Sequence, residues 1–136
     1  MEHEITLNWL EKMAFESTQP DGYKIRLDAD ENPETSATRP KPLLLSALAG
    51  CTAMDVVSLL QKMRVDLKKL DIKVKGELTE DHPKYYKSMH ITYILSGSNI
   101  DREKVEKAIS LSQEKYCGVS ALFRMAIPVS YSVEIN

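Results

Sequence analysis

Apolar residues crowd the stretch from Lys41 to Met63 on every side of a helical turn. Because no polar face is left over, the pattern predicts a long helix that is buried on most of its faces. A membrane span is the competing interpretation, since about eighteen apolar residues can cross a bilayer. Asp55 lies near the middle of the stretch, where a carboxylate would be costly in lipid. The pattern therefore favours a core helix over a membrane span.

Before this helix, apolar and polar residues alternate in short runs that are typical of strands. Such runs occur at Ile5–Trp9, Met13–Ser17 and Tyr23–Leu27. The last two are separated by Gln19–Gly22, whose proline and glycine predict a turn. We expect an antiparallel meander, followed by a polar loop from Asp28 to Arg39 that has no periodicity.

After the helix, the pattern predicts two strands, two helices and a closing strand. They are expected at Leu70–Leu78, Met89–Leu95, Arg102–Lys115, Val119–Met125 and Pro128–Ile135. Gly76 is a candidate bulge, Ser96–Asn99 a turn, and Asp101 a helix cap. The element order predicts a single α+β domain over residues 1–136, with an antiparallel β-sheet and a long buried central helix.

Composition and charge narrow the class of protein. The chain has 136 residues, of which 43% are hydrophobic and 28% charged, and its net charge is −2. These values are typical of a globular protein, and the absence of a basic stripe argues against nucleic-acid binding. The acidic first residues carry no secretory signal, so we expect a cytoplasmic protein that does not bind membranes. Because one small sheet cannot cover the central helix, we also expect a homodimer.

Two cysteines are the candidates for chemistry. Cys51 lies inside the central helix and is either an inert core thiol or a reactive one. Cys117 precedes Gly118 at a break before a short helix, whose amide dipoles would favour a thiolate; the alternative is a half-buried loop thiol. Spacing alone does not show that the two cysteines meet. Two distant cysteines and three scattered histidines make no ligand set, so we expect no metal.

Charged residues near the central helix have two interpretations each. Arg39 could hold an anion at the start of the helix or be a solvated loop residue, and Arg26 on a strand faces the same choice. Asp55 shares a helix face with Cys51, four residues earlier. A carboxylate beside a thiol raises the pKa of the thiol, so we interpret Asp55 as a structural partner rather than an activator.

Two segments together resemble the OsmC/Ohr family. They are Arg39–Leu60, which contains Cys51, and Glu114–Leu122, which contains Cys117. The likeness extends over essentially the whole chain, including the order of elements. It implies an OsmC-like fold in an intertwined homodimer, with two active sites at the subunit interface.

The resemblance also implies an activity, a thiol-dependent peroxidase that reduces organic hydroperoxides without a cofactor. Cys51 would be the peroxidatic cysteine and Cys117 the resolving one, and an external dithiol would reduce the resulting disulfide. Peroxidase members usually carry, nine residues before the first cysteine, a glutamate that is paired with an arginine. Here Pro42 holds that position, and Arg26 and Arg39 are both candidates for the arginine. The alternative is a dimer that binds a small apolar ligand or serves another thiol-redox role.

Overall fold

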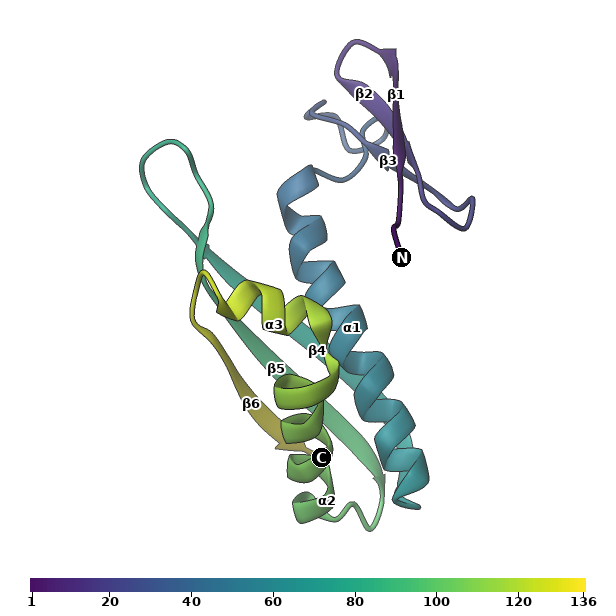
Figure 1. Ribbon diagram of the computed structural model, residues 1–136, viewed down its shortest axis with the longest axis vertical. Coiled ribbons are helices and arrows are strands. Elements are labelled where there is room, and N and C mark those ends of the chain that lie inside the picture. Colours follow the sequence, from purple (N-terminus) through teal and green to yellow (C-terminus); the bar gives the residue numbers. More distant parts are fainter. The chain divides into compact units, whose positions relative to one another are not determined.

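The computed structural model describes residues 1–136, which form two compact units, 1–43 and 44–136 (Figure 1). The first unit is a three-stranded antiparallel sheet in the order β1-β2-β3. Its strands are β1 (Thr6–Glu11), β2 (Ala14–Thr18) and β3 (Lys24–Leu27). Between β2 and β3, Gly22 adopts φ +92° and donates from its amide to the Gln19 carbonyl at 2.9 Å. The predicted meander and its turn are confirmed.

The second unit carries the site. Its sheet has the order β4-β5-β6, and three helices lie on one face of that sheet (Figure 1). The strands are β4 (Asp66–Leu78), β5 (Tyr86–Ser98) and β6 (Val129–Ile135). The helices are α1 (Pro40–Lys62), which brings the chain from the first unit into the second, α2 (Arg102–Leu111) and α3 (Gly118–Arg124). The element order agrees with the sequence prediction, and the α+β class is confirmed.

One strand direction was predicted wrongly. β4 and β5 pair antiparallel as expected, but β6 pairs with β5 in parallel. Parallel neighbours need a long crossover connection. Here α2 and α3 provide it by crossing the face of the sheet between the end of β5 and the start of β6. The sheet of this unit is therefore mixed rather than purely antiparallel.

The strands β4 and β5 are longer than the alternation predicted, and the predicted bulge at Gly76 is not present. β5 continues to Ser98, through most of the expected turn. Gly76 is no bulge, because it pairs in register with Met89. A Cβ at this position would lie 2.5 Å from the Tyr86 ring, so the glycine allows that ring to cross the strand closely.

Helix α1 is confirmed, but within one chain it is buried on one stripe only. That stripe recurs every fourth residue, at Leu48, Thr52, Val56 and Leu60, and faces the core. On its other sides Leu44 is 45% exposed and Met54 76% exposed, so the expected burial on most faces is not reached within one chain. α1 is the one helix that is long and apolar enough to span a membrane, a test that core helices of soluble proteins also pass.

The predicted break before Cys117 has an unusual form. Asp101 caps α2 as expected, since its carboxylate accepts from the Glu103 amide at 2.9 Å. The helix then widens into a five-residue π-helical turn, η1 (Ser112–Tyr116). The turn closes where the Cys117 amide donates to the Ser112 carbonyl at 2.7 Å. Such π-helical turns often lie at functional sites.

Candidate active site

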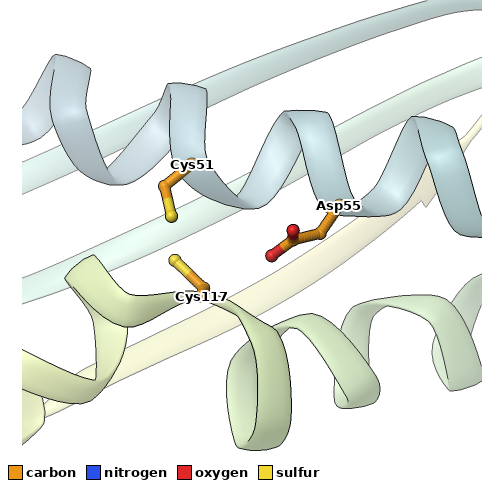
Figure 2. Close-up of side chains that lie close together, drawn as sticks. All are labelled: Cys51, Asp55 and Cys117. Carbon is orange, nitrogen blue, oxygen red and sulfur yellow. The ribbon is translucent and has the colours of Figure 1, made fainter. Parts of the chain in front are cut away.

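The structure brings the two cysteines together. Cys51 lies on α1 beside the buried stripe, and Cys117 lies where η1 meets α3. Figure 2 shows their sulfur atoms pointing toward one another, with the Asp55 carboxylate beside them. The two Sγ atoms and a carboxylate oxygen all lie within 4.8 Å of one another. Both cysteines are free thiols. The sequence left open whether the two cysteines meet, and the structure shows that they do, because the segments that carry them cross.

The two thiols have different surroundings. Cys51 is partly exposed, whereas Cys117 is only 2% exposed. Burial, and then the hydrogen bond with Cys51, raise the pKa of Cys117 from an ordinary 9.0 to about 11. The Ser120 amide, which donates to the Cys117 sulfur at 3.4 Å, lowers this pKa but does not compensate. Of the two interpretations of Cys117, the structure therefore favours the buried, protonated thiol over the thiolate.

Asp55 is held by a hydroxyl, as the structural interpretation predicted. Ser112 Oγ donates to Asp55 Oδ2 at 2.9 Å. Because that proton is used, Thr52 Oγ1 must donate to Ser112 Oγ, from which it lies 2.8 Å. The Tyr93 hydroxyl, 2.6 Å from Thr52 Oγ1, must then donate to Thr52. The hydroxyl protons all point toward the carboxylate.

Gln113 closes the other end of this chain of hydroxyls. Its amide nitrogen donates to the Tyr93 hydroxyl at 2.9 Å, and its amide oxygen accepts from Ser120 Oγ at 2.6 Å and from Arg124 at 3.0 Å. No buried side-chain polar atom in the structure lacks a partner. A fully satisfied network is rigid, so it fixes η1, and with it Cys117, against α1.

The comparisons with known proteins agree with this architecture. A model of a family described as OsmC-like protein matches residues 14–132. The chain belongs to the OsmC-like family. Protein YhfA of Escherichia coli (strain K12) is 32% identical over 129 residues, which are 95% of each chain.

Two solved structures have a similar fold over nearly the whole chain. A hypothetical protein from Aquifex aeolicus VF5 is 29% identical and has a TM-score of 0.81, over 100% of this chain and 98% of that one. The organic hydroperoxide resistance protein OhrB of Bacillus subtilis is 19% identical and has a TM-score of 0.62, over 100% and 98%. At that identity OhrB shows a shared fold alone.

The two candidate arginines belong to the first unit. Arg26 Nη2 lies 3.5 Å from Asp28 Oδ2. The guanidinium of Arg39 binds backbone carbonyls, including those of Asp28 and Asp30, and the Ser36 hydroxyl at 3.1 Å. These contacts order the loop between β3 and α1. Neither arginine is among the side chains that the second unit brings to Cys51. A role for Arg26 or Arg39 as the cation beside Cys51 therefore stays a prediction.

The polar residues that support the site in this OsmC-like chain were not predicted from the sequence. They are Thr52, Tyr93, Ser112, Gln113 and Ser120, which are all buried. One signal was present, because Thr52 interrupts the apolar stripe of α1 between Leu48 and Val56. A polar residue on a buried stripe needs a partner.

Proposed function

We propose that this chain is a thiol-dependent peroxidase that reduces organic hydroperoxides with Cys51 and Cys117. The observation that carries the proposal is the convergence of two free thiols in unequal surroundings. Membership of the family and the fold shared with OhrB, which is described as an organic hydroperoxide resistance protein, support the same class of substrate.

The unequal surroundings assign the two roles. A peroxide must reach the attacking sulfur, and Cys51 is the more exposed of the two. Cys117 keeps its proton at neutral pH, because its pKa is about 11. The thiolate is the nucleophile in such reactions, so Cys51 attacks and Cys117 resolves.

The reaction then proceeds in balanced steps. The Cys51 thiolate attacks one peroxide oxygen, an S–O bond forms, and the O–O bond breaks; the alkoxide takes a proton from solvent and leaves as an alcohol. The Cys117 sulfur attacks the Cys51 sulfenic acid, and the Cys117 proton leaves with the displaced hydroxide as water. An external dithiol returns two electrons and two protons to the disulfide and is itself oxidised.

Activation of Cys51 differs here from the pattern that the family resemblance implies. Pro42 carries no carboxylate, so an arginine at the site would have no glutamate to orient it. We include Arg26 and Arg39 as the candidates for a cation at Cys51. Replacement of each by Lys, which keeps the charge but loses the planar fork, distinguishes them by the rate of Cys51 alkylation.

The proposal includes a homodimer, supported by apolar side chains that one chain leaves exposed. On α1 these are Leu44 and Met54, and on β1 Trp9 is 69% exposed. Obligate interfaces of this apolar kind commonly bury more than ~2,000 Å² in total. Sedimentation at micromolar concentration should give twice the chain mass, and a single-chain mass would contradict this part of the proposal.

The test of the function compares two matched variants by intact mass spectrometry. Wild type treated with one equivalent of cumene hydroperoxide should lose two hydrogen atoms and both free thiols. Cys51→Ser should leave the peroxide unconsumed. Cys117→Ser should add one oxygen and, under excess peroxide, a second one, because its sulfenic acid has no partner. Equal behaviour of the variants, or two free thiols surviving in wild type, would overturn the proposal.

A further inference from the structure

When both thiols are reduced, the cysteine pair and the Asp55 carboxylate are three potential metal-binding groups in one place. The two Sγ atoms and the carboxylate oxygen come from two segments that cross, and all lie within 4.8 Å of one another. Around one tetrahedral zinc ion, sulfur and oxygen ligands lie roughly 3.5–3.8 Å apart. Small side-chain rotations would therefore close the three groups around an ion. From this geometry we infer that the reduced chain binds Zn²⁺ through Cys51, Asp55 and Cys117.

The donor set selects the class of metal. Two thiolates and one carboxylate suit zinc and other borderline or soft divalent ions, and do not suit magnesium or calcium, which prefer oxygen ligands. Three protein ligands leave the fourth tetrahedral position for water or a small anion. Cys51 and Asp55 are only partly buried, so solvent can reach the position between them.

The surrounding hydrogen bonds orient the ligands, as the hydrogen-bond partners of metal ligands do in known metal sites. Ser112 occupies Asp55 Oδ2, and Oδ1 accepts no hydrogen bond from the protein. The free oxygen belongs to a carboxylate that is anchored through Ser112 to Thr52. The network that holds Cys117 against α1 therefore also positions the acidic ligand.

Metal binding at this site depends on the redox state of the chain. Zinc requires both sulfurs as thiolates, so its binding releases the Cys117 proton to solvent. A disulfide between Cys51 and Cys117 removes both sulfur ligands at once. Conversely, bound zinc occupies the sulfur that attacks peroxide. Zinc affinity itself rests on the geometry alone; the mutual exclusion with peroxide reduction rests on the proposed function.

The test uses the full-length, reduced and metal-free protein, with Co²⁺ as a spectroscopic probe and Zn²⁺ in competition with a chromophoric chelator. We expect one ion per chain, a thiolate-to-cobalt charge-transfer band and the visible bands of a tetrahedral site. Asp55→Asn should weaken Zn²⁺ binding at least about tenfold, and Ser112→Ala, which removes only the orienting hydroxyl, by about 10–100-fold. Asp71→Asn, a matched change on an exposed strand position, should leave the affinity unchanged.

Three results would overturn the inference. They are the absence of stoichiometric binding at micromolar Zn²⁺, equal binding by the disulfide form, and an Asp55→Asn affinity equal to wild type. If Asp55→Asn does not fold, the test is whether Zn²⁺ protects the thiols of the wild-type protein from alkylation. Zn²⁺ should slow alkylation of both cysteines at least about tenfold. Unchanged alkylation rates would count against the site. Zinc binding without peroxide reduction would support this inference while refuting the proposed function, so the two can fail separately.

Discussion

Replacement of Thr52 by Val tests whether the buried hydroxyl network stabilises the fold. The two side chains have nearly the same shape, and Thr52 is fully buried, so the change removes a hydroxyl without opening a cavity. After the change Ser112 still donates to Asp55, and the amide of Gln113 still donates to Tyr93. The Tyr93 O–H is then a buried donor without an acceptor, and Gln113 Nε2 loses its 3.2 Å hydrogen bond to Thr52 while keeping the one to Tyr93.

The loss of unfolding free energy in Thr52→Val depends on how many buried groups are left without a partner. A stranded buried donor costs about 1–3 kcal/mol, whereas groups that keep a partner lose little. We therefore expect Thr52→Val to lower the free energy of unfolding by about 1–3 kcal/mol, and not by the sum of three hydrogen bonds. The change should also slow disulfide formation between Cys51 and Cys117 after peroxide treatment, because the network fixes η1 on α1.

The assay is urea unfolding followed by far-UV circular dichroism at one fixed protein concentration, since the apparent stability of the proposed dimer would depend on concentration. The midpoint should fall while the m-value stays constant. Thr92→Val is the matched control, because the Thr92 hydroxyl lies on a more exposed sheet face, 3.4 Å from Ser132 Oγ. It should change stability by less than about 0.5 kcal/mol. If Thr52→Val behaves like this control, the network does not stabilise the fold and our reasoning is refuted.

Three further predictions use the same unfolding assay. Gly97→Ala should lower the free energy of unfolding by about 1–3 kcal/mol, because its Cβ would overlap a backbone carbonyl oxygen. Gly50→Ala should raise it by about 0.5–1 kcal/mol, because no atom lies within 4 Å of the added Cβ and alanine favours the helix. A more stable Gly97→Ala and a less stable Gly50→Ala would contradict this prediction. Asp55→Ala should cost about 1–3 kcal/mol yet leave Cys51 alkylation intact, and wild-type melting with all thiol reactivity lost would make Asp55 catalytic. Because folding raises the pKa of Cys117 from 9.0 to about 11, the reduced, metal-free protein should lose stability from pH 9 to pH 11. Cys117→Ser should make that loss smaller without abolishing it, since burial also raises the pKa of Tyr93.

The sequence predicted elements well where the information is local. Alternation and turn residues located the meander of the first unit, and Asp101 located the start of α2. The direction of β6 is not local information, because a strand next to β5 shows the same alternation whether the pairing is parallel or antiparallel. Only the path of the crossover through α2 and α3 decides it.

The cysteine pair shows the same limit at the site. Each cysteine was identified as a candidate from its own surroundings, but their meeting depends on how η1 lies against α1. That arrangement is fixed by Thr52, Tyr93 and Gln113, which come from three separate elements. A network of this kind leaves a weak trace in the sequence, because each member taken alone is an ordinary polar residue.

Cys117 illustrates why a correctly predicted helix start can still suggest the wrong direction for a pKa shift. Its position before α3 was predicted, and the Ser120 amide does donate to its sulfur as the start of a helix allows. A single amide at 3.4 Å stabilises the Cys117 thiolate. Burial, Cys51 and Asp55 destabilise that thiolate by more, so the pKa is raised. The sign of the shift therefore depends on tertiary neighbours rather than on the motif. In the function that we propose, the same neighbours keep the proton on Cys117, and Cys51 is then the sulfur that attacks the peroxide.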